Sequence, residues 1–146
     1  RLEMHCRKMS PSDLESVLEI QNELAFQNWT IKQLESECSS PLSISLVLII
    51  NEQVLGYLFI QVIGDEAELL SIAIKSDYSR RGAGSFLWQE GLSALKEKNV
   101  RTVFLEVREN NITAQLFYKK QDFICYGLRK RYYSDGENAL LFRFDF

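Results

Sequence analysis

Three consecutive apolar runs within residues 44–74 constrain the fold more than any other feature of this sequence. The first two, residues 44–50 and 54–63, are separated only by a short polar turn, which is typical of an antiparallel hairpin. The third, residues 67–74, is almost continuously apolar, and we expect a strand that is buried on both faces. A chain that contains this block must form a sheet, and its other segments must cover that sheet.

Helical segments are predicted on both sides of this block. Ser10 and Thr30 suit the N-cap position, because Pro11 follows Ser10 at the first helical position and Gln33 follows Thr30 at capping-box spacing. The remaining predicted elements are helices over residues 82–98 and 112–120, and strands over residues 2–8, 100–107, 123–131 and 139–146. The predicted order of elements is βααβββαβαββ, which indicates an α+β fold.

The composition fits one compact domain over residues 1–146, with 46% hydrophobic and 25% charged residues. The net charge of −3 lacks the positive field of nucleic-acid-binding proteins, so we expect no nucleic acid as a partner. No signal-like segment and no apolar run long enough to span a bilayer occurs, so we expect a cytoplasmic protein without a membrane partner. The cysteines are far apart and form no Cys-x-x-Cys pair, which indicates neither a disulfide framework nor a metal site.

A glycine-rich turn directly follows the third apolar run. Its residues are Ser79, Arg80, Arg81, Gly82, Ala83, Gly84 and Ser85. Glycines let backbone approach a ligand closely, and the N–H groups of a helix's first turn favour an anion such as a pyrophosphate. Arg80 and Arg81 would add cationic donors to phosphate oxygens. The turn matches neither a Walker loop nor a complete dinucleotide fingerprint, and a plain strand-to-helix connection is the alternative interpretation.

Two further blocks lie in the C-terminal half of the chain. One is Leu-Glu-Val-Arg at residues 105–108, followed at fixed spacing by Asn111, Ala114, a Leu-Phe-Tyr run at residues 116–118 and Phe123. The other is Tyr-Tyr-Ser-Asp-Gly-Glu-Asn-Ala at residues 132–139. With the glycine turn, these blocks resemble the GCN5-related N-acetyltransferase (GNAT) superfamily, and within it the RimI-like enzymes, which are ribosomal-protein-alanine acetyltransferases.

The resemblance implies a GNAT fold with a mixed, mainly antiparallel seven-stranded sheet and about four helices. It implies acetyl-CoA as cosubstrate, no metal, and a protein N-terminus as acceptor, by analogy the N-terminal alanine of a small-subunit ribosomal protein. We expect a monomer or a weak homodimer. This chain has Ser79 where the superfamily's signature has Gln or Arg, and Asp122 where it has Gly. Because Asp tolerates a left-handed conformation, we expect the turn at Asp122 to be kept.

Two residues match catalytic positions of the family. Glu106 is the candidate general base, on the strand face that it shares with Phe104 and Arg108. A surface glutamate paired with Arg108 is the alternative that the strand pattern alone leaves open. Tyr118 is the candidate acid, because a hydroxyl of pKa near 10 can protonate a thiolate of pKa near 8.5 at a cost of about 2 kcal/mol. An aromatic residue that only fills the core is its alternative.

Further site residues follow from the same resemblance. Asn111 is a candidate contact to the cosubstrate or a helix N-cap. If their strand splays from its neighbour, the backbone N–H groups near Ile72, Ala73 and Ile74 would pair with the pantetheine arm and polarise the thioester oxygen. The candidate substrate-binding residues are Trp29, Tyr132 and Tyr133, with core packing as the alternative for Trp29 and strand formation for the tyrosines.

Other functions stay open on the sequence. His5 and Cys6 are strand neighbours that point to opposite faces, so no covalent acyl-enzyme is indicated and direct transfer in a ternary complex is expected. An acetyltransferase for a small-molecule amine or a lysine side chain is one alternative. A CoA-binding module without turnover is another, and the presence of both Glu106 and Tyr118 disfavours it.

Overall fold

The computed structural model describes residues 3–24, 29–79 and 81–146. The strands are β1 (Met4–Lys8), β2 (Ser43–Ile50), β3 (Gln53–Ile63), β4 (Glu66–Ile74), β5 (Thr102–Arg108), β6 (Ile124–Arg129) and β7 (Ala139–Asp145). The helices are α1 (Leu14–Leu24), α2 (Ile31–Ser39), α3 (Ala83–Glu97) and α4 (Ile112–Lys120), with short 3-10 helices at Pro11–Asp13 and Ser76–Tyr78. The predicted order of elements is confirmed.

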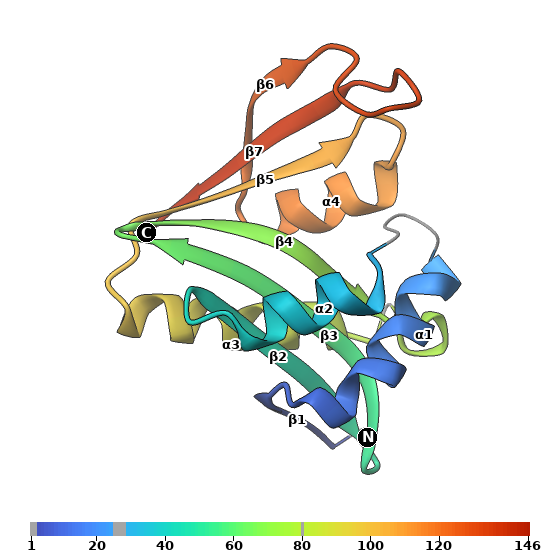
Figure 1. Cartoon of the computed structure of the whole chain (residues 1–146). Coiled ribbons are helices and arrows are strands. Elements are labelled where there is room, and N and C mark those ends of the chain that lie inside the picture. Colours follow the sequence, from blue (N-terminus) through green and yellow to red (C-terminus); the bar gives the residue numbers. More distant parts are fainter. Residues whose placement is uncertain (1–2, 25–28, 80) are drawn as a thin grey trace.

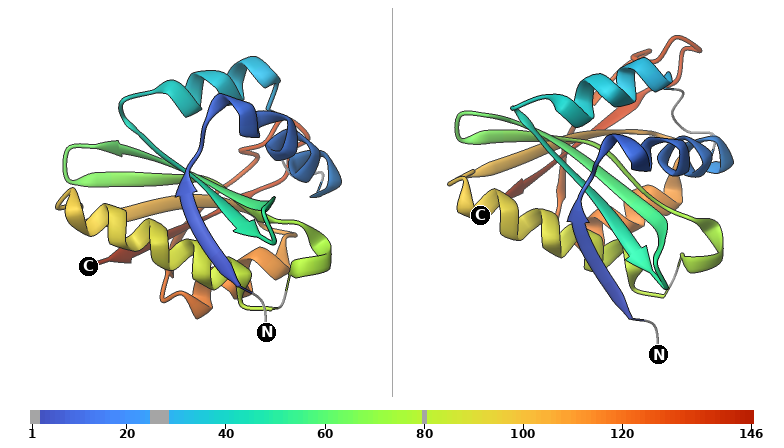
Figure 2. Two further views of the ribbon diagram at one scale, coloured as in Figure 1. Left: turned by 90° about the horizontal axis from the view of Figure 1, so that it is seen from below. Right: turned by 60° about the horizontal axis from the view of Figure 1, so that its bottom comes forward.

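The strands of the described ranges form one seven-stranded sheet in the order β1-β2-β3-β4-β5-β7-β6. Strands β4 and β5 run parallel, and the other neighbouring pairs run antiparallel. Helices α1 and α2 cover one face of the sheet, and α3 and α4 lie on the other (Figures 1 and 2). The expected mixed, mainly antiparallel sheet is therefore confirmed. The helices of the described part are too short or too polar to cross a bilayer.

The local turn and cap signals lie where the sequence predicts them. Asn51 and Glu52 have φ of 52° and 65°, so the turn between β2 and β3 uses left-handed residues. Thr30 and Gln33 form the capping box, in which the Thr30 N–H donates to Gln33 Oε1 at 2.8 Å and the Gln33 N–H donates to Thr30 Oγ1 at 3.2 Å. Asp122 has φ of 69°, which confirms the expected left-handed turn without glycine.

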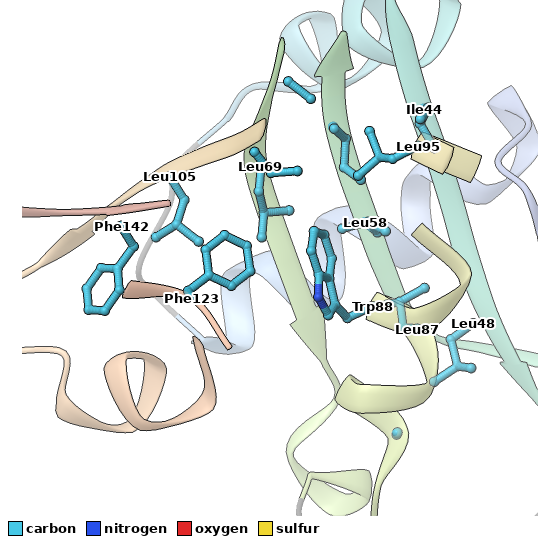
Figure 3. Packing of buried hydrophobic residues seen from close by; sticks show 14 of the residues in the cluster. Ile44, Leu48, Leu58, Leu69, Leu87, Trp88, Leu95, Leu105, Phe123 and Phe142 are labelled. Carbon is cyan, nitrogen blue, oxygen red and sulfur yellow. The ribbon is translucent and has the colours of Figure 1, made fainter. Parts of the chain in front are cut away.

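The larger of two hydrophobic clusters fills the space between the sheet and α3 (Figure 3). Leu58 of β3 packs there against Leu87 and Trp88 of α3, and these side chains are at most 1% exposed. Gly91 lets the helix lie close to the sheet, because a Cβ at this position would stand 2.7 Å from Leu58 Cδ2. Leu87, Gly91 and Leu95 recur at helical spacing on the buried face of α3, and Trp88 lies beside them.

Strands β4 and β5 separate along their length (Figure 1). Their pairing covers Glu66–Glu68 of β4 against Thr102–Phe104 of β5. Between β3 and β4 the register shifts, so that Leu70 is an extra residue on β4, and such a bulge bends its strand. The prediction that residues 67–74 are buried on both faces is wrong for Leu70, Ile72 and Ile74, which are half-buried because the diverging strands leave open space beside them.

An ion pair joins β1 to the turn before α1. The Arg7 guanidinium donates to both carboxylate oxygens of Asp13, at 2.7 and 2.9 Å, and the Ser10 N–H donates to Asp13 Oδ2 at 2.8 Å. The Asp13 carboxylate is buried, and the hydrogen bond from Arg7 is the main reason that its pKa is lowered. Because the pKa is lower in the folded protein than in the unfolded chain, Asp13 stabilises the fold at neutral pH, and this contribution is lost as the pH falls through the lowered value.

The substitution Asp13→Asn is therefore expected to lower the free energy of unfolding at pH 7 by about 1–3 kcal/mol. The difference between wild type and variant should narrow as the pH falls below about 4, because Asp13 is then protonated in the unfolded wild-type chain and, at still lower pH, in the folded protein. Denaturant unfolding at several pH values measures both effects. The control is Asp65→Asn, at an exposed position in the turn before β4. An equal difference at pH 7 and pH 3 would contradict the assigned role of the Asp13 charge.

Candidate active site

Two clefts meet where β4 and β5 diverge. The first, which we call the glycine-turn cleft, has a volume of about 520 Å³ and lies between the end of β4, the turn before α3, and α4. The second, the central cleft, has a volume of about 170 Å³ and is lined by α1, β3, β4, β5, α4 and the loop between β6 and β7. Residues that line both clefts include Ile72, Ala73, Asn111, Ala114 and Tyr118. The two clefts therefore share a wall and adjoin each other in the splayed sheet.

The glycines of the turn are required by its geometry. Gly82, directly before α3, has φ of 79°, in the left-handed region where a side chain is strained. A Cβ on Gly84 would stand 3.0 Å from Phe117 Cε1 of α4, so glycine keeps this part of the cleft open. Gly82, Gly84 and Ser85 line the glycine-turn cleft, whereas Ala83 is fully buried in the core.

Of the two arginines of the turn, only Arg81 lies among the described residues. Arg81 is exposed, and its guanidinium lies 5.7 Å from the centroid of the Tyr78 ring. Arg80 lies outside the described residues. The first N–H groups of α3 have no partner within the helix and favour negative charge beside this end of the cleft. The predicted contact of both arginines to phosphate stays a prediction.

Glu106 lies at the point where the central cleft crosses β5. Burial alternates along β5, which confirms that Glu106 shares a face with Phe104 and Arg108. Its Oε2 atom is buried and has no hydrogen-bond partner among the described residues. The alternative pairing with Arg108 does not form, because Arg108 Nη1 binds Asp135 and Glu137 of the β6–β7 loop instead, each at 2.8 Å. A carboxylate left with a free buried oxygen is suited to accept a proton or a hydrogen bond from a ligand.

Negative charge gathers around Glu106. Hydrogen bonding to the Glu106 carboxylate is the main reason that the pKa of Tyr132 is raised. Burial, and then the charge of Glu106, raises the pKa of Tyr133 and of Glu68. The charges of Arg129 and Arg108 oppose these shifts, so the carboxylates of Glu106 and Glu68 lie in a neighbourhood that also holds two cations.

Tyr118 projects from α4 and lines both clefts. Its ring packs against Phe123 and Phe142, with centroids 5.7 and 6.3 Å away. Burial raises the pKa of its hydroxyl above the ordinary value, with the nearby Tyr133 adding to the shift. The hydroxyl therefore stays protonated at neutral pH, and proton donation to a thiolate is more strongly uphill than for an ordinary tyrosine.

Asn111 is the N-cap of α4, since its Oδ1 accepts a hydrogen bond from the Ala114 N–H at 3.1 Å. Asn111 lines both clefts, so the N-cap places its side chain where the two clefts adjoin. The predicted N-cap is confirmed. A contact from Asn111 to a cosubstrate stays a prediction.

The three candidate substrate-binding residues lie in different surroundings. Tyr133 lines the central cleft, and the Arg108 guanidinium lies 4.1 Å from its ring centroid, which fixes the β6–β7 loop against β5. Tyr132 is 45% exposed, and its ring centroid lies 5.1 Å from that of Tyr133. Trp29 packs against Phe59, with ring centroids 5.4 Å apart, and belongs to the smaller hydrophobic cluster beneath α1 and α2. Its role as a substrate wall stays a prediction.

Sequence reasoning missed two polar features of the site. One is the network that Arg108 makes with the loop, which no local pattern encodes. The other is Gln21 of α1, which lines the central cleft and is only 2% exposed. A signal for Gln21 was present, because it follows Leu14 and Val17 and precedes Leu24 at the helical spacing of a core-facing position.

The described residues hold no group of three or more His, Cys, Asp or Glu side chains that could bind a metal ion. The Glu106 carboxylate, with one unpartnered oxygen, and the Tyr118 phenol line the central cleft, which shares residues with the cleft at the glycine turn.

Comparison with known proteins agrees with this arrangement. The model of the acetyltransferase (GNAT) family matches residues 14–123. A ribosomal protein bS18-alanine N-acetyltransferase from Haemophilus influenzae is 37% identical over 133 residues, which are 88% of this chain and 90% of that protein. The crystal structure of the ribosomal-protein-S18-alanine N-acetyltransferase from Escherichia coli has a TM-score of 0.89 and 27% identity, over 98% of this chain and 94% of that one.

A second solved structure, Ard1 from Thermoplasma volcanium, has a TM-score of 0.92 and 30% identity, over 97% of each chain. The family match covers more than half of the chain, and the relatives match it over most of its length. The chain belongs to the acetyltransferase (GNAT) family, and it is an acetyl-CoA-dependent N-acetyltransferase.

Proposed function

We propose that this enzyme acetylates the N-terminal amine of a protein, with alanine as the first residue and a small-subunit ribosomal protein as the acceptor. The observation that carries the proposal is the unpartnered buried oxygen of Glu106 in the same cleft as Tyr118, which also lines the cleft at the glycine turn. The names of the Haemophilus influenzae and Escherichia coli relatives support the choice of acceptor. A ribosomal acceptor implies that the reaction takes place in the cytoplasm.

The residues of the glycine-turn cleft fit acetyl-CoA. The splay of β4 from β5 leaves one edge of residues 72–74 facing the cleft, where backbone groups can pair with the amides of a pantetheine arm. Gly82 and Gly84 leave room for phosphate close to the backbone at the start of α3. Bound there, acetyl-CoA supplies an acetyl group activated as a thioester.

Glu106 and Tyr118 would then move the protons of the reaction. An N-terminal amine has a pKa of about 7.7–8.0, so much of it is protonated at neutral pH. Glu106, directly or through a water, takes one proton from the ammonium form and passes it to solvent, which leaves the neutral nitrogen able to bond to the acetyl carbon. Tyr118 gives its hydroxyl proton to the sulfur as the carbon–sulfur bond breaks, and the second proton that the nitrogen loses on acetylation restores the phenol through solvent. The transfer is direct, so the enzyme itself forms no covalent bond to the acetyl group.

The test of the proposal measures acetyl-CoA consumption with a peptide that begins with a free alanine. The same peptide with a blocked N-terminus is the matched control, and polyamines, aminoglycosides and a peptide whose only free amine is a lysine side chain complete the panel. We expect turnover with the free N-terminus and little with the other acceptors. Turnover with the small amines or the lysine peptide alone would contradict the proposal and favour the corresponding alternative acceptor.

A further inference from the structure

Gln21 presents a buried amide oxygen that has no partner. The side chain is 2% exposed, and its Nε2 donates to the Trp29 carbonyl oxygen at 2.8 Å. Because a carbonyl oxygen can only accept, this bond decides which end of the amide is the nitrogen. Oε1 is therefore the remaining atom, and it is buried without a hydrogen-bond partner among the described residues.

Because Gln21 lines the central cleft, a bound ligand can donate the hydrogen bond that this oxygen lacks. Gln21 reaches the central cleft from α1, whereas Glu106 and Tyr118 reach it from β5 and α4. A buried carbonyl oxygen without a donor is costly, and such groups in folded proteins are nearly always satisfied. Since the oxygen belongs to a residue that lines the cleft, a donor on the bound acceptor can satisfy it.

The chemistry of the acceptor identifies the donor. In a protein N-terminus, the reacting amine is followed two carbons later by the N–H of the first peptide bond. This N–H is neutral, and an uncharged amide oxygen is a matched acceptor for it. A lysine side chain has only methylene groups at the same distance from its amine, so it would leave Oε1 unsatisfied.

We propose that Gln21 Oε1 accepts a hydrogen bond from the N–H of the acceptor's first peptide bond and so selects a protein N-terminus over a lysine side chain. The inference rests on the proposed function. Gln21 is a positioning residue in this scheme, because it binds the acceptor next to the reacting amine. Its bond to Trp29 holds the side chain in place, which reduces the conformational entropy that binding would otherwise cost.

The test compares two acceptors that differ in one donor. One is a peptide that begins with alanine, and the other is the same peptide with an ester oxygen in place of the first peptide N–H. The value of kcat/KM is measured for both acceptors, by mass spectrometry of the acetylated product, with wild type, Gln21→Met and Gln21→Glu. Differences in the intrinsic reactivity of the two acceptors cancel, because they are the same for every enzyme.

We expect the ratio of kcat/KM for amide over ester to fall about tenfold from wild type to Gln21→Met. Gln21→Glu should keep the wild-type ratio, since a carboxylate oxygen still accepts the hydrogen bond. Both substitutions remove the donor to Trp29, so an effect through that contact would lower the rates with both acceptors and leave the ratio unchanged in both variants. Asn22→Met, at an exposed position on the same helix, should change neither rate nor ratio.

Equal ratios for wild type and Gln21→Met would overturn the inference and leave the proposed function intact. A fall in the ratio for Gln21→Glu as large as that for Gln21→Met would also overturn it. If wild type acetylates neither peptide, the proposed function fails, and the inference fails with it. Unfolding temperatures of all the variants confirm that the comparison is made on folded protein.

Discussion

Replacing Glu106 with glutamine is expected to lower kcat by about 10²- to 10⁴-fold, with little change in the affinity for CoA. Glutamine keeps the size of the side chain and its hydrogen-bonding capacity, but it cannot take a proton. The affinity for CoA should survive, because Glu106 lines the central cleft and not the glycine-turn cleft. Steady-state kinetics with an N-terminal alanine peptide and calorimetric titration with CoA measure the two quantities separately.

The activity that remains in the Glu106→Gln variant should rise as the pH increases through about 8. Above the pKa of the acceptor amine, solvent has already removed the proton that Glu106 would take. The matched control is Glu97→Gln, at an exposed position at the end of α3, and it should behave as wild type. If kcat of the Glu106→Gln variant is unchanged at neutral pH, Glu106 is not the general base and has only a structural role.

The second large effect is expected at Tyr118. The substitution Tyr118→Phe should also lower kcat by about 10²- to 10⁴-fold, because the departing sulfur loses its proton donor. The ring contacts with Phe123 and Phe142 are kept by phenylalanine, so the unfolding temperature should change little. Tyr126→Phe, at a 50% exposed position on β6, is the matched control.

The raised pKa of Tyr118 gives a further expectation for pH dependence. Because burial shifts its ionisation above the ordinary value of about 10, the hydroxyl stays protonated through the usual assay range. Ionisation of Tyr118 should therefore cause no decline of the wild-type rate between about pH 8 and 10. Any decline in that range should also occur in the Tyr118→Phe variant. A decline in that range that disappears in the variant would mean that Tyr118 ionises far more easily than its burial indicates.

The sequence predicts local geometry well in this protein. The capping box at Thr30 and the left-handed turn at Asp122 depend on residues that are close in the chain, and each lies where its pattern places it. The side of β5 that carries Glu106 follows from alternation alone. The glycine turn is recognisable for the same reason, because the left-handed conformation at Gly82 depends on a residue within the turn itself.

Long-range relations were not predictable in the same way. The extra residue at Leu70 arises from the pairing register of β3 and β4, and neither strand encodes that register alone. The resulting bend separates β4 from β5. Ile72 and Ile74, which the sequence predicts to be buried on both faces of the sheet, therefore line a cleft instead. The partners of Arg108 lie nearly thirty residues away in the chain, whereas the nearby Glu106 remains unpaired at one oxygen.

By itself, the sequence determined the order of the elements, their caps and turns, and the residue types available for acetyl transfer, because these depend on interactions within a few residues. Only the tertiary structure decided where the sheet opens, which polar atoms face the opening, and which remain without a partner. Gln21 shows the difference most clearly. Its helical spacing places it toward the core, but its free oxygen depends on a bond to Trp29 and on a cleft that five other elements line together with α1.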